Sequence, residues 1–416
     1  MKTALSLMFL IISFCSFAQW EIIYENDSMP YGNHITHVGN TIIGAGGGKS
    51  YEPVYDNGNI WISSDMGDTW ETIWVDPICW GLSVLNPDTI YGGGMDGWYS
   101  VTYDGGSTWT NVSNDLGFAT DYIDLHFFND SVGLLYNSYL QRTVDRGNSW
   151  TLLDSIYQHC TPGSELDFYD YSNRHFCQVD DSLLFLATTH GILRTTDLGL
   201  TWNQIFYDTT REFRAVNMRD SVNGFAVADS GYVYRTTDGW QSGVFVAQLY
   251  EQLHDIAFIQ DSIVLIAGGG KNWNPGNNDT SGYVFYSPDN GNTWICDRIN
   301  DKRISSLTAI GDTVFAIGGG VKIFRCRNIQ SIVNSIKANA SFSYSIFPNP
   351  FSDYITVTLP LDEFSRIDIF DIQGRLYRQM RISGINKIDL SELVAGQYFI
   401  RIENSRHIYS CPLIKM

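Results

Sequence analysis

Positive charge is scarce in this sequence of 416 residues. Lysine and arginine together number 26, against 45 aspartates and glutamates, which gives a formal net charge of −19. This balance disfavours binding to nucleic acid or to anionic membranes, and it suits a soluble protein outside the cell. Beyond the N-terminal region, no segment approaches the roughly 18 unbroken apolar residues of a membrane-spanning helix, so the sequence predicts none.

Cysteine clusters are lacking as well. The seven cysteines form neither a CxxC pair nor a group with histidines, so we expect no zinc site and no other metal or cofactor. Six of them lie beyond residue 18, where an oxidising compartment would let disulfides persist. Cys160 and Cys177 flank one long loop, and a bridge there would contribute roughly 3 kcal/mol through loop-closure entropy. Cys296 and Cys326 could also pair, and the spacing leaves both cases open.

Residues 1–18 are typical of a secretory signal peptide. They contain Lys2, an apolar run from Ala4 to Phe14, and Ser16-Phe17-Ala18 as a cleavage site. Cys15 follows Phe14 rather than a small residue, which argues against a lipoprotein signal. We therefore expect export and removal of this segment.

One eight-residue phrase recurs between residues 63 and 294. It reads Ser/Thr-x-Asp-x-Gly-x-Ser/Thr-Trp in five full copies, and a decayed copy, TTDGWQSG, begins at Thr236. The aspartate can accept backbone N–H bonds, the glycine supplies a positive φ, and the tryptophan can fold over its own turn. The phrase therefore predicts a structural hairpin turn rather than a catalytic or metal-binding group. Its aspartate and tryptophan pairs are Asp65 and Trp70, Asp104 and Trp109, Asp145 and Trp150, Asp197 and Trp202, and Asp289 and Trp294.

The spacing of the phrase predicts a β-propeller. Its aspartates, with the decayed copy included, lie 39 to 52 residues apart, which suits one four-stranded blade each. Seven strand pairs rich in β-branched and aromatic residues can be recognised, and the last, Thr313–Cys326, has no such phrase after it. Trp20–Ile23 repeats the start of the outer strands and so completes the seventh blade. We predict an all-β, seven-bladed propeller over residues 19–330, closed by its N-terminal strand, which removes exposed sheet edges.

The phrase resembles the Asp-box, or bacterial neuraminidase repeat, of β-propeller proteins. Sialidases with such boxes bind the substrate carboxylate with three arginines, the first of them ahead of the first box. Here no arginine precedes Arg142, so the resemblance does not extend to sialidase activity. Xyloglucanase-type hydrolases with similar boxes place the cleft between two rings, whereas this chain has the repeats for one.

The repeats stop after Ser331, and a different module follows. Residues 331–343 are predicted to be a linker, and residues 344–416 alternate short strands with turns, as in a small immunoglobulin-like β-sandwich. Pro348-Asn349-Pro350, Asp371 to Leu376 and Gly396-Gln-Tyr398 resemble landmarks of the C-terminal sorting domain of the type IX secretion system. This resemblance implies contact with that machinery, removal of the module, and a protein that is secreted or held on the outer cell surface.

Three long insertions are predicted to lie on one face of the ring, opposite the repeated turns. They are Gly46–Gly58, Ser155–Arg174 and Gly268–Gly282, and functional loops gather on such faces. Aromatic rings with a few polar groups suit sugar or peptide binding, although they could instead pack the loops together. The candidate binding residues are Tyr51, Trp98, Tyr169, Tyr171, Arg174, His175, His190 and Trp273.

Two functions remain open at this point. We favour a recognition protein, expected to be monomeric, that presents this face to a glycan or peptide and has no catalytic residues. The alternative is a glycoside hydrolase, other than a sialidase, that uses a carboxylate pair at the centre of the ring. Asp121 or Asp124 together with Asp255 would form that pair.

Overall fold

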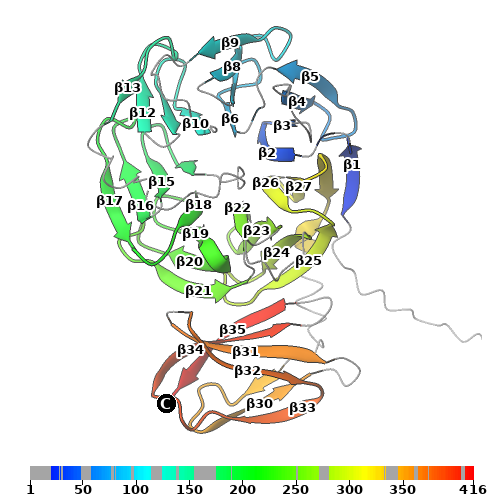
Figure 1. Cartoon of the computed structure of the whole chain (residues 1–416), viewed down its shortest axis with the longest axis vertical. Helices are drawn as coiled ribbons and strands as arrows, with labels where there is room; N and C mark the ends of the chain where they lie inside the picture. The colour runs from blue at the N-terminus through cyan, green and yellow to red at the C-terminus, as the bar shows by residue number, and fades with distance from the viewer. Residues whose placement is uncertain are drawn as a thin grey trace, which may run out of the picture.

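The computed structural model shows an all-β protein, as predicted (Figure 1). The residues that the structure describes are 20–27, 29, 31–47, 58–75, 79, 81–94, 98–113, 124–136, 140–153, 175–188, 190–249, 252–270, 281–331, 333, 345–359, 364–372, 374–403 and 408–416. The predicted signal peptide lies outside them. Within these ranges no helix is long and apolar enough to cross a membrane.

Seven four-stranded antiparallel sheets occupy the described part of residues 21–326, and Figure 1 shows them arranged in a ring. Each sheet is open, with its inner strand toward the centre. In order from the inner to the outer strand, the sheets are β2 (Tyr31–Val38), β3 (Thr41–Gly47), β4 (Gly58–Ser63) and β5 (Glu71–Val75); β6 (Gly81–Val84), β7 (Ile90–Gly93), β8 (Trp98–Thr102) and β9 (Thr110–Ser113); β10 (Asp124–Phe127), β11 (Gly133–Tyr136), β12 (Leu140–Thr143) and β13 (Thr151–Leu152); β14 (Phe176–Gln178), β15 (Leu184–Thr188), β16 (Gly191–Thr195) and β17 (Asn203–Tyr207); β18 (Phe213–Met218), β19 (Gly224–Ala228), β20 (Tyr232–Thr236) and β21 (Val244–Gln248); β22 (Leu253–Ile259), β23 (Ile263–Gly269), β24 (Gly282–Ser287) and β25 (Ile295–Asn300); and β26 (Ile304–Ile310), β27 (Thr313–Gly318), β28 (Lys322–Cys326) and β1 (Glu21–Glu25).

The first strand of the chain lies in the same sheet as the last strands of the ring. β1 pairs antiparallel with β28, with Ile22 opposite Phe324, so it is the outer strand of the sheet that β26 begins. A short 3₁₀ helix, η2 (Asp229–Gly231), connects β19 to β20. The two ends of the ring, with Ile22 on one and Phe324 on the other, are thus joined by main-chain hydrogen bonds.

Hydrophobic clusters fill the spaces between neighbouring sheets. The middle strands are buried on both faces, as in β23 (IVLIAGG), where all seven residues are buried. Alternate residues of β24 enter different clusters: Phe285 packs toward the preceding sheet, whereas Val284 and Tyr286 pack toward the next one. Val333 belongs to one of these clusters, so the packing of the ring continues into the segment that the sequence assigned to a linker.

A two-sheet sandwich follows the ring. One sheet has the order β29 (Ser345–Phe347), β30 (Tyr354–Thr358) and β33 (Ile385–Asp389), and the other has the order β32 (Leu376–Ile382), β31 (Ser365–Asp371), β34 (Gly396–Glu403) and β35 (Ile408–Lys415). Residues from both sheets, among them Ile355, Ile369 and Ile400, enclose a separate core. Figure 1 shows this sandwich beside the outer strands β21 and β25 of the ring.

Candidate functional site

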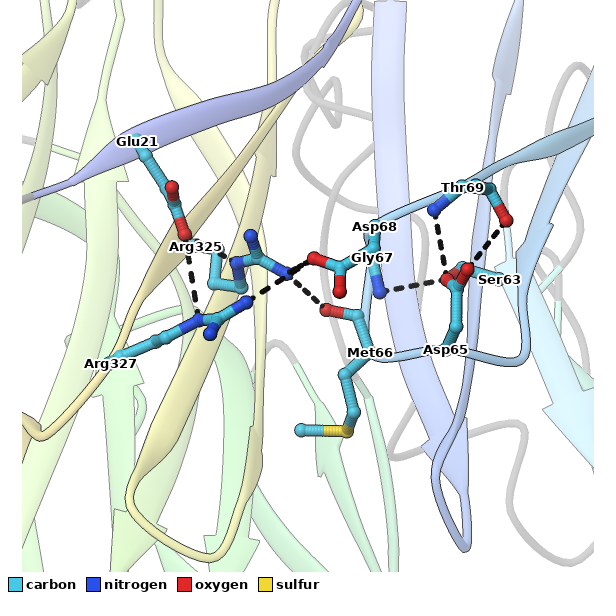
Figure 2. Close-up of polar contacts among 9 residues, drawn as sticks. All are labelled: Glu21, Ser63, Asp65, Met66, Gly67, Asp68, Thr69, Arg325 and Arg327. Carbon is cyan, nitrogen blue, oxygen red and sulfur yellow. Dashed lines mark hydrogen bonds and ion pairs between the residues drawn. The ribbon is translucent and has the colours of Figure 1, made fainter.

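The first repeated turn joins β4 to β5 and is held by its own side chains (Figure 2). Asp65 accepts from the Thr69 backbone N–H at 2.9 Å, the Thr69 hydroxyl at 2.6 Å and the Ser63 hydroxyl at 2.8 Å. Ser63 Oγ in turn accepts from the N–H of Gly67, whose φ of 87° favours glycine. These bonds, the Thr69 hydroxyl first, lower the pKa of Asp65 to about 2. The carboxylate is therefore ionised and engaged within its own turn.

All six copies share this arrangement, the decayed one included. In each, the aspartate accepts from both the N–H and the hydroxyl of the residue four positions later; the other five aspartates are Asp104, Asp145, Asp197, Asp238 and Asp289. The side-chain hydrogen bonds from Thr108 and Ser149 are the largest cause of the lowered pKa values of Asp104 and Asp145. The geometry thus supports a structural role for these aspartates.

The tryptophans of the turns pack into the clusters between sheets. Trp294 is fully buried beside Phe225, and Trp70, Trp109, Trp150 and Trp202 pack against four other clusters. In the decayed copy the tryptophan comes three residues early. Trp240 occupies the glycine position with φ 68°, is fully buried, and contacts Phe206 with ring centroids 5.6 Å apart. The packing role of Trp240 was not predicted, because the repeated phrase has its tryptophan at the eighth position only.

Arginines near the end of two third strands link their own sheet to the repeated turn of the next sheet. Arg142 donates to the carbonyl of Leu198 at 2.8 Å, and Arg235 donates to that of Asn290 at 2.7 Å. Both acceptors have positive φ and lie at the same place in the turn. Sequence reasoning missed this link, although a signal was present, since Arg142 and Arg235 each directly precede the first residue of a repeated phrase, Thr143 or Thr236.

Arg325 makes the same link across the junction between the last and first sheets (Figure 2). It lies on β28, donates to the Met66 carbonyl at 2.7 Å and contacts Asp68 Oδ1 at 2.6 Å. It also pairs with Glu21 on β1. Its side chain is only 8% exposed, whereas that of Arg327, which contacts the same two carboxylates, is 53% exposed. One guanidinium thus joins the first strand, the last strand and the first turn.

The inner strands are linked by side chains that accept backbone N–H groups of their neighbours. Asp255 is buried, and its carboxylate accepts from Ser306 Oγ at 2.7 Å, Leu307 N at 2.9 Å and Ile256 N at 2.7 Å. Comparable bonds run from Ile35 N to Ser306 Oγ and from Phe127 N to Ser83 Oγ. Asp255 therefore holds β22 to β26, which favours a structural role for its carboxylate over a place in the catalytic pair.

Only part of the candidate binding face lies within the described residues. Tyr51, Tyr169, Tyr171, Arg174 and Trp273 lie outside them, as does Asp121, and nothing is described of the Trp98 side chain. His175 precedes β14, and its Nδ1 lies 3.3 Å from Asp124 Oδ2 at the start of β10. The Tyr136 ring stands edge-on to His175 at 5.1 Å. His190 lies between β15 and β16, at the same end of that sheet as His175.

The structure thus brings together two residues that the sequence had placed in different hypotheses. Asp124 belonged to the hydrolase alternative and His175 to the binding face, yet they contact each other between neighbouring sheets. Inner strands begin at this face, whereas the repeated turns follow third strands, which run parallel to the inner ones and end at the opposite face. In the described part of the chain, no group of three or more His, Cys, Asp or Glu side chains could hold a metal ion.

The described cysteines bear on the predicted disulfides. Cys177 is buried, and its Sγ accepts from Met218 N at 3.2 Å, whereas Cys160 lies outside the described residues, so that bridge stays a prediction. Cys296 and Cys326 belong to two different clusters on opposite faces of the β22–β25 sheet. The second pairing is therefore wrong, because a sheet separates the two side chains.

Comparisons with known proteins identify the C-terminal module. Residues 345–415 match the family model of the secretion system C-terminal sorting domain. This domain indicates export and a secreted or cell-surface location. A search of curated proteins found no match.

Solved structures resemble the fold. YCF48 bound to D1 peptide is 16% identical with a TM-score of 0.54, covering 75% of this chain and 98% of that one. YCF48 from Cyanidioschyzon merolae is 17% identical with a TM-score of 0.53, covering 74% and 98%. The GH74 enzyme of Niastella koreensis is 14% identical with a TM-score of 0.51, covering 82% of this chain and 59% of that one. These likenesses show a propeller-like fold.

Proposed function

We propose that this chain is a secreted or cell-surface recognition protein that binds a glycan or peptide on the face where the inner strands begin. Export proceeds through the type IX secretion machinery, which contacts the sorting domain. The observation that carries the proposal is the engagement of the turn aspartates and of Asp255 in bonds that hold the ring together. These carboxylates serve the scaffold, and recognition falls to the face opposite the turns.

The scaffold in this proposal is a seven-bladed Asp-box propeller over residues 19–330, preceded by a signal peptide and followed by a linker and the sorting domain. Its support is the pairing of β1 with β28 and the contacts of Arg325 at the same junction. A ring whose first and last strands share a sheet is held by main-chain hydrogen bonds between its two ends, which makes it rigid. That rigidity keeps the binding face in one shape, which lowers the entropy cost of binding.

The proposed position of the binding face is supported by the long connecting segments and the side chains that belong to it. Residues 48–57, 154–174 and 271–280 connect strands whose ends lie at this face, and His175, Asp124 and Tyr136 lie at the same ends of their own strands. The Tyr136 ring is buried in a core cluster and fixes the position of the histidine, while the side chains of His175 and Asp124 are 14% and 8% exposed and supply hydrogen-bonding groups at this face. One of the similar structures, YCF48, is bound to a peptide, which makes a peptide ligand as reasonable as a glycan.

Array binding combined with hydrolysis assays tests this function. We expect the full chain to bind a subset of glycans or peptides and His175→Ala to weaken binding roughly fivefold or more, as for a residue central to an interface. His37→Ala, which changes a histidine near the other end of an inner strand, is the matched control and should bind normally. Hydrolysis of chromogenic glycosides by the wild type but not by Asp124→Asn would contradict this proposal and favour the glycoside hydrolase.

Removing the Arg325 guanidinium tests the junction. We expect Arg325→Met to lower the free energy of unfolding by about 1–3 kcal/mol, because Met66 O, Glu21 and Asp68 lose a charged donor. Arg327→Met, whose exposed side chain contacts the same carboxylates, should cost less than about 1 kcal/mol. Urea unfolding measures both changes in stability. Equal losses in the two variants would mean that the buried contacts of Arg325 do not stabilise the junction.

A further inference from the structure

The sorting domain contributes an aromatic side chain to one of the hydrophobic clusters of the ring. Along β34, Tyr398 and Ile400 pack in the sandwich's own core, whereas Phe399 belongs to a cluster of the ring. Its ring lies edge-on to Phe245 of β21, with centroids 4.7 Å apart. Phe399 is 3% exposed and Phe245 is 8% exposed, so each buries the other. Phe399 thus has no part in the sandwich core and is directed at the ring.

A second contact lies at the turn between β31 and β32. The hydroxyl of Tyr232, the first residue of β20, donates to the Gly374 carbonyl at 2.9 Å. Gly374 has φ 73°, and a Cβ there would meet the Tyr232 hydroxyl at 2.1 Å, so the close approach requires glycine. Asp371 and Arg375 hold this turn through an ion pair of 2.7 Å. On the ring side, the Arg211 guanidinium lies 3.7 Å from the Tyr232 ring centroid.

The last strand of the chain also lies against the ring. β35 is the edge strand of its sheet and contacts β21 and β25, the outer strands of two ring sheets (Figure 1). Exposed edge strands are liable to pair with other chains, and covering them prevents this. The sheet of β29, β30 and β33 lies on the far side of the sandwich from the ring.

We propose that Tyr232 and Phe245 of the ring, with Phe399 and the Gly374 turn of the sorting domain, form an aromatic latch that holds the two parts as one body before export. The latch forms only on folded β20 and β21, so it couples the orientation of the sorting domain to the folding of the ring. It covers β35 and leaves the β29–β30–β33 sheet facing outward, toward the secretion machinery. Release of the sorting domain exposes Tyr232 and Phe245 on the outer edge of the ring.

Small-angle scattering and amide hydrogen exchange on the full chain test the latch. We expect the wild type to scatter as one compact particle and Phe399→Ala to have a larger radius of gyration. Amide exchange in β21 and β35 should rise about tenfold, since an aromatic pair contributes roughly that factor to the closed state. Val394→Ala, at a position in the same module that is 75% exposed, is the matched control and should match the wild type.

A variant on the ring side separates undocking from misfolding of the sandwich. Phe245→Ala leaves every residue of the sorting domain unchanged and should increase the radius of gyration and the exchange of β35 in the same way. Tyr232→Phe, which removes only the hydroxyl, should produce a smaller rise. A sorting domain that already moves freely in the wild type, or Phe245→Ala and Phe399→Ala variants that both match Val394→Ala, would overturn the proposal.

Discussion

A chain that ends at residue 344 is expected to remain in the periplasm and to be nearly absent from the cell surface and the medium. The reason is that residues 345–415 form the sorting domain, which the secretion machinery must contact. Cell fractionation followed by immunoblotting measures the distribution. The ring should still fold in the truncated chain, because Phe399 is the only residue in the described part of the sandwich that enters a ring cluster.

The fold of the retained protein is the control for this experiment. Protease resistance of the periplasmic ring distinguishes failed export from degradation of an unfolded chain. A full-length Val394→Ala variant, altered at an exposed position of the sorting domain, should reach the surface in normal amounts. Surface display of the truncated chain at wild-type levels would show that the module does not direct export.

Trp294→Ala is expected to lower the free energy of unfolding of the ring by about 3–5 kcal/mol, as large-to-small core substitutions do. Trp294 is fully buried between the β18–β21 and β22–β25 sheets, and its Nε1 donates to the Gly291 carbonyl at 3.1 Å. The substitution removes both the packing and this bond. Urea unfolding, followed by circular dichroism on the full chain, measures the loss.

An exposed tryptophan on the outer strand of another sheet provides the comparison. Trp74 on β5 is 62% exposed, so Trp74→Ala should change stability by no more than about 0.5 kcal/mol. Equal stability of the Trp294→Ala variant and the wild type would contradict the packing role of the turn tryptophan. A large loss in both variants would instead point to a general sensitivity of outer strands.

The repeated turns could be predicted in detail because their contacts are local. Asp65 bonds to Ser63 and Thr69, all within seven residues, so the phrase contains both partners of each hydrogen bond. The dependence on local contacts also explains why the position of one turn tryptophan was not predicted. Trp240 reaches the same kind of cluster from another position of its turn, and a search for identical offsets cannot register such a replacement.

The links between sheets could not be predicted at the level of residues. Arg325 and Met66 are far apart in the sequence, and Asp255 and Ser306 belong to different repeats. Asp255 was a candidate catalytic group because the sequence placed it near the centre of the ring, and its hydrogen-bond partners could not be recognised from the sequence. Its partners lie on the next inner strand, where its carboxylate accepts their hydrogen bonds and holds the two strands together.

The sequence by itself determined the class of fold, the repeated turns and the sorting domain, because periodic patterns and short-range hydrogen bonds depend on residues that are close together in the sequence. Tertiary structure alone decided which charged groups are engaged in the scaffold, that Asp124 meets His175, and that Phe399 faces the ring. The physical reason is that the burial and the contacts of these groups depend on partners from distant parts of the chain, and only the packing of one sheet against another brings those partners together.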